Sequence, residues 1–299
     1  METPVLFMIF NRPDTTKGIF EAIRKAKPPK LFVAADGPRP DKPGEWEKCQ
    51  KVREIATAVD WDCEVKTLFR DTNLGCRVGV SRAIDWFFQR VEEGIILEDD
   101  CLPTQSFFGF CQELLERYRY DERVMMISGN NFQFGRQCGS YSYYFTKYTH
   151  IWGWASWKRA WKFYDVNMNL WPEIKKNGLL RGLVNNSKEM NYWEQIFDRV
   201  HASKIDTWDY QWTFCCWVQN GLSVLPNVNL VSNIGLGIES THTHKDSPLA
   251  NMPVLPMEFP LKHPPFLLCD SKADSITFKN ICSSSFIKRV INRLVRIVR

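Results

Sequence analysis

Short apolar runs alternate with helix-patterned stretches along the first part of the chain. The first of them, bounded by proline on both sides, is typical of a buried parallel strand. These runs span residues 4–10, 30–40, 63–70, 94–100 and 124–129. Between them, apolar residues recur at helical spacing over 14–26, 44–58, 77–91 and 104–119. The alternation predicts an α/β fold, a mainly parallel sheet flanked by helices.

The later part of the chain is less regular. The pattern predicts helices over 187–203 and 210–219 and a proline-rich loop over 245–275. The terminal segment 283–299 has apolar residues at helical spacing and lysine or arginine on the other face, without any acidic residue. Such a helix either docks on the domain or lies on an anionic membrane. The missing acidic residues favour membrane contact over 286–299.

Composition and charge restrict the class of protein. The net charge of +5 is mild and gives no reason to expect a nucleic-acid partner. The ten cysteines are scattered without CxxC spacing, and the N-terminus lacks a secretory pattern, so we expect reduced thiols, no zinc site and a cytoplasmic protein. No apolar stretch approaches the roughly 20 residues of a membrane-spanning helix.

Tryptophan is concentrated in the second half. Of the 12 tryptophans, nine fall between positions 152 and 217. Core packing is one interpretation of this cluster. The other is a sugar-binding surface, because flat aromatic faces stack on the C–H faces of sugar rings.

Carboxylates follow two of the predicted strands. Asp36 ends the second strand, and Glu98, Asp99 and Asp100 end the fourth. Ligands of open α/β sheets bind at the carboxyl ends of the strands. Strand alternation would place Glu98 and Asp100 on one side and Asp99 on the other. Clustered carboxylates repel unless a cation lies among them, and hard oxygen ligands select Mg²⁺ or Mn²⁺, usually together with phosphate oxygens. The alternative is a solvated acidic turn that begins the next helix.

The segment ILEDDCLPTQSFFGFCQELLERY resembles the acidic metal-binding segment of GT-A glycosyltransferases, in the EDD form of N-acetylglucosaminyltransferase I. Further pieces agree in order, namely PVLFMIFNRP, LFVAADGPR, NLGCRVGVSRAIDWFF, ISGNNF, THIWGWASW and TWDYQW. Bacterial sugar transferases that share ADGPR, NLGC, EDD and WGWA are similar as well. The resemblance covers about residues 4–245.

The resemblance implies roles for the residues that would bind the donor. Asp100 would bind the metal, Asp99 would hold the ribose hydroxyls, and Glu98 would brace the site. Asp36 would hydrogen-bond a uracil-type base, which Arg12 would stack on or bind.

Other implied roles concern the diphosphate and the acceptor. Either Arg77 or Arg82 would neutralise the diphosphate. Asp209 matches the catalytic base, although the second acid of the family is replaced here by Tyr210. A helix N-cap is the alternative role of Asp209. His242, in an HxH pair with His244, would add a ligand to the cation or the diphosphate.

The resemblance implies a metal-dependent, inverting glycosyltransferase of the hexosyltransferase type. A UDP-sugar is the favoured donor, with GDP and dTDP donors left open, and the acceptor is a glycan or a lipid-linked glycan. The basic tail suggests surface polysaccharide assembly at the inner membrane face. The implied domains are 1–245 for the transferase, with a nucleotide half to about 130 and an acceptor half from 131. A loop extension over 246–282 and the basic helix over 283–299 follow. A two-metal hydrolase that uses the histidine pair and a non-catalytic carbohydrate-binding protein are the alternatives.

Overall fold

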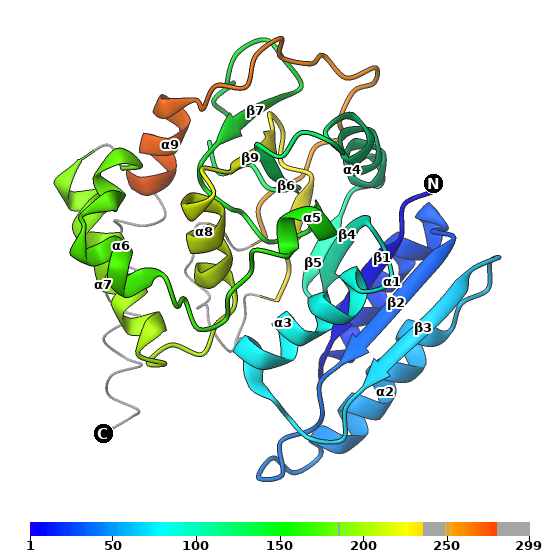
Figure 1. Ribbon diagram of the computed structural model, residues 1–299. Coiled ribbons are helices and arrows are strands. Elements are labelled where there is room, and N and C mark those ends of the chain that lie inside the picture. Colours follow the sequence, from blue (N-terminus) through cyan, green and yellow to red (C-terminus); the bar gives the residue numbers. More distant parts are fainter. Residues whose placement is uncertain (185, 236–248, 250, 280–299) are drawn as a thin grey trace.

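A mixed eight-stranded sheet forms the centre of the chain (Figure 1). The computed structural model describes residues 1–184, 186–235, 249 and 251–279. The strands lie in the order β3-β2-β1-β4-β8-β6-β9-β7. Their bounds are β1 Val5–Ile9, β2 Lys30–Ala35, β3 Glu64–Phe69, β4 Glu93–Glu98, β6 Val124–Ser128, β7 Tyr143–Thr146, β8 Trp154–Trp157 and β9 Leu222–Pro226. Strands β1 to β4 are parallel, whereas β8 and β7 run antiparallel to their neighbours.

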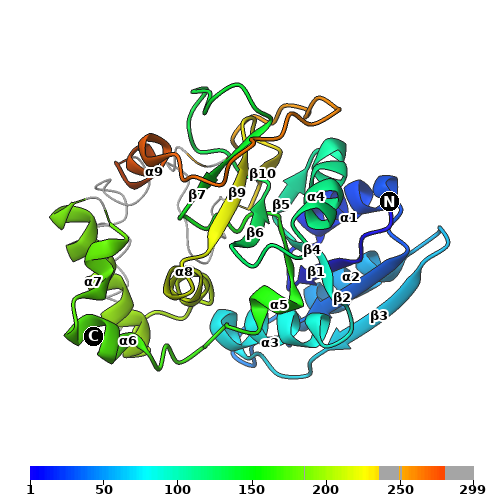
Figure 2. The same cartoon turned by 45° about the horizontal axis from the view of Figure 1, so that its top comes forward.

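Helices cover both faces of this sheet (Figure 2). They are α1 Pro13–Ala26, α2 Glu45–Thr57, α3 Gly75–Phe88, α4 Gln105–Arg117, α5 Lys158–Trp161, α6 Trp171–Lys176, α7 Ser187–His201, α8 Asp209–Val218 and α9 Ser271–Thr277, with a short 3₁₀ helix at Leu179–Gly182. One core contains α1, α2 and α4, and the other contains α3 and α5 to α8. Consecutive strand residues serve opposite cores: Phe7 packs in the first and Met8 in the second. Burial on both faces explains why β1, β2, β4 and β6 are mainly apolar runs, whereas β3 at the sheet edge is largely exposed.

The strand order reverses at β1. The chain proceeds outward from β1 to β2 and β3, and then returns to β4 on the other side of β1. The helices that follow these two strands, α1 and α4, pack in the same core. Ligands of open α/β sheets bind in the crevice outside the carboxyl ends of the strands at such a switch point. A two-stranded antiparallel ladder of β5 (Cys101–Pro103) and β10 (Val231–Asn233) lies directly after β4.

The α/β prediction is confirmed, and the differences lie mainly in the second half. Each predicted strand and helix of the first 130 residues is present, with shifts of a few residues at the ends. The short strands β5 and β7 to β10 were not predicted. The predicted loop over 245–275 is wrong at its end, because α9 begins at Ser271 with Asp270 as a cap that accepts from the Ala273 amide. The predicted helix over 283–299 lies outside the described residues.

The tryptophan-rich segment forms core. Trp154, Trp157, Trp208 and Trp212 are each at most 2% exposed, and Trp154 stacks on Trp208 with ring centroids 5.6 Å apart. Core packing, and not a sugar-binding surface, is therefore the correct interpretation for these rings. The nine cysteines within the described ranges are free thiols, and most of them are buried. In the same part of the chain, no helix is long and apolar enough to span a membrane.

The carboxyl of Asp274 links α9 to the sheet edge, and it predicts a pH dependence of stability. Thr146 Oγ1 donates a hydrogen bond to Asp274, which is buried. Burial raises the pKa of Asp274 to about 6. The folded state therefore holds this proton more tightly than the unfolded state, so stability is lost as the pH rises from about 4 to 6.

We expect this group to contribute a fall of at most about 3 kcal/mol in the free energy of unfolding across that window. Urea denaturation between pH 4 and 7 checks the prediction, with Asp274→Asn as the comparison. The variant should lose that part of the pH slope. An identical slope in both proteins would contradict the assignment.

Candidate active site

Three acidic residues lie together where β4 ends at the sheet switch point, with Asp99 buried and Glu98 and Asp100 half-buried. β4 ends at Glu98, so Asp99 and Asp100 lie in the turn that follows. Asp99 is 7% exposed, and its Oδ2 accepts a 2.9 Å hydrogen bond from the Phe10 amide at the end of β1. The Oε1 atom of Glu98 is buried without a hydrogen-bond partner among the described groups. This burial argues against a solvated turn, and α4 begins only at Gln105, after β5.

Arg12 provides the positive charge of this cluster. Its Nη1 atom lies 2.7 Å from Asp100 Oδ2 and 3.5 Å from Asp99 Oδ1. The expectation that Asp99 and Asp100 face opposite sides is therefore wrong, because strand alternation ends with β4 and the turn brings both carboxylates to one guanidinium. Gly235 packs against the ion pair of Arg12 and Asp100. A Cβ atom there would lie 2.5 Å from Asp100 Oδ2 and 2.9 Å from Arg12 Nη1.

Burial and mutual repulsion raise the pKa values of these acids. The pKa of Asp99 is raised to about 7, first by desolvation and then by the charge of Asp100, while Arg12 acts in the opposite direction. The pKa of Glu98 is raised well above its ordinary value by desolvation and by Asp100, Asp99 and Asp209. Like charges that are buried in this way favour either protonation or a bound cation.

Asp36 lies at the same edge of the sheet, directly after β2. Its carboxylate accepts hydrogen bonds from the Leu74 amide at 2.9 and 3.1 Å and from the Gly37 amide at 3.1 Å. Desolvation nevertheless raises the pKa of Asp36. Asn73 Nδ2 donates to the Gly37 carbonyl at 2.9 Å, so the loops after β2 and β3 hold each other through Asp36 and Asn73.

Gly37 permits this close approach of two loops. An added Cβ would lie 2.4 Å from Thr72 N and 2.5 Å from Thr72 C, both backbone atoms. We expect Gly37→Ala to lower the free energy of unfolding by about 1–3 kcal/mol, because the two backbones must separate. Gly18→Ala is the matched control, because nothing lies within 4 Å of an added Cβ in this α1 position. That variant should gain about 0.5–1 kcal/mol. Urea denaturation measures both, and an equal effect of the two changes would contradict the account.

Asp209 is the first residue of α8 and belongs to the same cluster. The N-cap of α8 is Trp208, so the predicted N-cap role of Asp209 is wrong. The Thr207 hydroxyl donates to Asp209 Oδ1. Asp209 lies close enough to Glu98 for its charge to contribute to the raised pKa of that buried carboxyl. A carboxylate from the second half of the chain thus reaches the acids at the end of β4.

The two arginines expected at the diphosphate have different surroundings. Arg77 donates to the Val166 carbonyl and to Ser203 Oγ, both at 2.7 Å, and to Asn167 Oδ1 at 3.3 Å. Arg82 is exposed, and its charge contributes to lowering the pKa of Arg70.

Sequence reasoning missed Arg70. Its Nη1 atom donates to the Gly79 carbonyl at 3.2 Å, and its charge acts on Asp36. The available signal was a basic residue directly after β3, at the same edge as Asp36. His242 and His244 lie outside the described residues.

The donor chemistry fits a hard divalent cation. Carboxylate oxygens are the ligands that Mg²⁺ and Mn²⁺ prefer, and Glu98 carries a buried oxygen without a hydrogen bond in the described structure. The Arg12 guanidinium already lies among these acids and supplies one positive charge to them. In the described part of the chain, no group of three His, Cys, Asp or Glu side chains is arranged to hold a metal by itself. A cation here would therefore depend on ligand oxygens and water for most of its shell.

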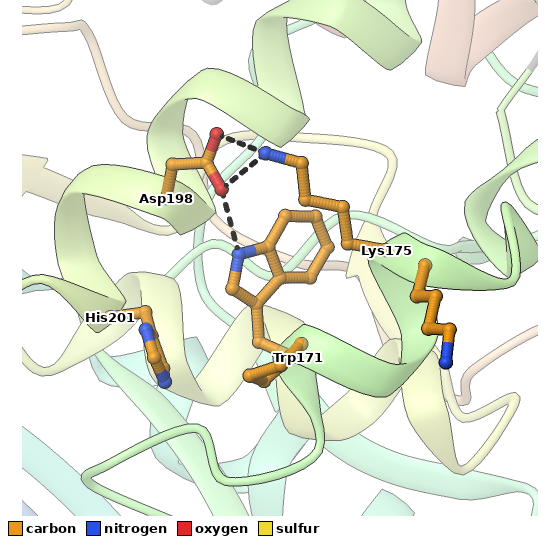
Figure 3. A pocket seen from close by; sticks show the side chains of 6 residues that line it. Trp171, Lys175, Asp198 and His201 are labelled. Carbon is orange, nitrogen blue, oxygen red and sulfur yellow. Dashed lines mark hydrogen bonds and ion pairs between the residues drawn. The ribbon is translucent and has the colours of Figure 1, made fainter.

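A concavity lies on α6 and α7, away from the strand ends (Figure 3). Its volume is about 520 Å³. Asp198 faces Trp171 and Lys175, accepting a 3.1 Å hydrogen bond from Trp171 Nε1 and bonds of 2.6 and 2.8 Å from Lys175 Nζ. Because these polar groups bind each other and Trp171 is only 2% exposed, the ring has no free face for a sugar. The strand ends remain the candidate active site.

Comparison with known proteins gives weak similarities. No protein-family model matches the chain, and no match to a curated sequence reaches significance. Among solved structures, 4-diphosphocytidyl-2C-methyl-D-erythritol synthase from Anaerococcus prevotii aligns over 54% of this chain and 74% of its own, with a TM-score of 0.34 and 6% identity. A UDP-glucose pyrophosphorylase complexed with UDP-glucose aligns over 54% and 71%, with a TM-score of 0.28 and 10% identity. Similarity at this level identifies no family.

Proposed function

We propose that the protein is a metal-dependent, inverting glycosyltransferase that moves a sugar from a nucleoside-diphosphate donor to a hydroxyl acceptor. The largely buried cluster of Glu98, Asp99 and Asp100 at the switch point carries this proposal. Three acids with one arginine leave an excess of negative charge at the crevice. A cation shared with a diphosphate relieves that excess.

The donor would lie along the carboxyl edge of the sheet. Asp36 would hydrogen-bond the base, with a UDP-sugar as the favoured donor, and Asp99 would bind the ribose hydroxyls. Asp100 would hold Mn²⁺ or Mg²⁺, which supplies positive charge for the departing diphosphate. Arg12, already at Asp100, would turn toward the nucleotide when the cation takes its place.

The reaction is a single displacement at the anomeric carbon. The bond from the acceptor oxygen to that carbon forms as the bond to the diphosphate oxygen breaks, so the configuration inverts. Asp209 takes the proton of the acceptor hydroxyl, and the nucleoside diphosphate leaves with the bonding electron pair. The charge of Asp209 helps to raise the pKa of Glu98, so a positive charge near the two carboxyls favours the ionised form of Glu98.

Two alternatives have less support. The burial of the central tryptophans removes the main reason for a carbohydrate-binding protein. A two-metal hydrolase would need His242 and His244, which lie outside the described residues.

The acceptor and the location of the protein are also part of the proposal. A basic helix over 286–299 would hold the enzyme on an anionic membrane, where a lipid-linked glycan of surface polysaccharide assembly is the acceptor. Deletion of 284–299 should then reduce binding to vesicles that contain anionic lipid, as measured by sedimentation. Equal binding by the shortened and the full chain would contradict this part.

Donor turnover tests the activity itself. The protein is incubated with UDP-, GDP- and dTDP-linked hexoses in Mn²⁺, and nucleotide release and the anomeric configuration of the product are followed by NMR. The proposal expects release from one nucleotide class, dependent on Mn²⁺ and with inversion. Hydrolysis of simple phosphate esters in place of nucleotide sugars would favour the hydrolase.

A further inference from the structure

We propose that Asp206 is a positioning residue that holds Asp209 at the active site through the first turn of α3. This inference rests on the proposed role of Asp209 as the base. It concerns the loop 203–208, which precedes α8.

Asp206 caps two amides in the first turn of α3, beside Asn73, whose Oδ1 accepts from the Gly75 amide at 3.2 Å. The N-cap residue Leu74 makes no side-chain capping bond. Instead, Asp206 Oδ2 accepts from the Cys76 amide at 3.1 Å, and Oδ1 accepts from the Arg77 amide at 3.0 Å. A carboxylate at a helix N-terminus satisfies free amides and interacts favourably with the helix dipole. The chain separation of about 130 residues makes this cap a tertiary tie between the two halves.

Arg77 makes a second contact with the same loop, through its side chain. Its Nη1 atom donates to Ser203 Oγ at 2.7 Å, three residues before Asp206. Gly75 leaves space for the tie, because its φ is +76° and an added Cβ would lie 2.8 Å from Asp206 Oδ2. The first turn of α3 is thus shaped to receive this particular loop.

The far end of the loop leads directly to the proposed base. Trp208 is buried against Trp154, and Thr207 donates to Asp209 Oδ1. Cys76 also bonds to the Trp208 backbone and lies within electrostatic reach of Glu98 and Asp209. Asp206 therefore fixes the side of the loop that the tryptophan packing does not hold.

The same turn of α3 also contacts the proposed nucleotide site. The Leu74 amide donates to Asp36, whereas the amides of Cys76 and Arg77 donate to Asp206. The two acids accept from different amides of one turn, so removal of the Asp206 carboxylate leaves the bonds to Asp36 in place.

Hydrogen exchange, nucleotide binding and turnover test this inference together. In Asp206→Ala, the amides of 207–210 should exchange about 10-fold faster. The kcat of nucleotide release from the donor identified in the panel should fall about 10- to 100-fold, with KM and the Kd of UDP with Mn²⁺ unchanged. Asp206→Asn, which keeps one acceptor oxygen, should recover part of both losses. The control is Asp121→Ala, which removes a carboxylate bonded to the Arg123 amide at 3.1 Å, far from the site in sequence.

Unchanged exchange at 207–210 in Asp206→Ala would overturn the inference, as would a Kd that weakens as much as kcat. An equal effect of Asp121→Ala on 207–210 would overturn it as well. If the proposed function is wrong, the wild type will not bind UDP with Mn²⁺. The exchange measurement will still decide whether Asp206 holds Asp209 in place.

Discussion

Asp209→Asn is expected to lower kcat by about 10²- to 10⁴-fold, the range contributed by a positioned general base. The amide keeps the size of the side chain and an oxygen that can accept from Thr207, so the start of α8 should persist. It cannot take a proton from the acceptor hydroxyl. Because the proposed role of Asp209 concerns the acceptor hydroxyl and not the donor, the Kd of UDP with Mn²⁺ should stay within about twofold of the wild-type value.

Turnover and calorimetry on the same preparation separate these effects. Thr207→Val is a useful companion, because it removes the hydroxyl that orients Asp209 and leaves the carboxylate. We expect a smaller fall for it, about 10-fold. If Asp209→Asn retained wild-type kcat, Asp209 would not be the base, and another carboxylate of the cluster would have to take that role.

Asp100→Ala should abolish metal-dependent nucleotide binding, weakening the Kd of UDP with Mn²⁺ by about 100-fold or more. Asp100 is the acid nearest to Arg12 and the one expected to bind the cation. Its removal also lowers the repulsion that Glu98 and Asp99 experience, while Asp99 remains a partner for Arg12. The fold should therefore persist, with a free energy of unfolding within about 1 kcal/mol of the wild type.

Calorimetry with and without Mn²⁺ checks binding, and urea denaturation checks the fold. Asp121→Ala again provides the control, because that carboxylate pairs with Arg123 outside the site. Retained metal dependence in Asp100→Ala would remove Asp100 from the cation site and direct attention to Glu98.

The first half of the fold could be predicted because most of its strands, all but the edge strand β3, are buried on both faces. Val5 to Ile9 are all buried, and such strands are unbroken apolar runs that stand out from the helices. The later strands carry a weaker signal. β8 is the four residues WASW and β10 is VSN, and both are too short to show a periodic pattern. Their conformation depends on pairing with strands that are distant in the sequence.

The candidate site was predictable only where strands end. Asp36 and Glu98 follow apolar runs directly, so the topology of an open sheet is enough to place them at one edge. The ion pairs of Arg12 with Asp99 and Asp100 depend on the turn after β4, where strand alternation no longer applies. Asp206 could not have been found in this way, because its partners are amides about 130 residues earlier in the chain. No local pattern records such a contact.

Calorimetry of the wild-type protein with UDP, GDP and dTDP, each with and without Mn²⁺, tests the central claim most directly. The claim is that the acids at the end of β4 hold a cation against a nucleoside diphosphate. It predicts tight binding of one nucleotide, UDP first, that weakens strongly when Mn²⁺ is removed with a chelator. Absence of binding by all three nucleotides in Mn²⁺, or binding that is indifferent to the metal, would contradict it.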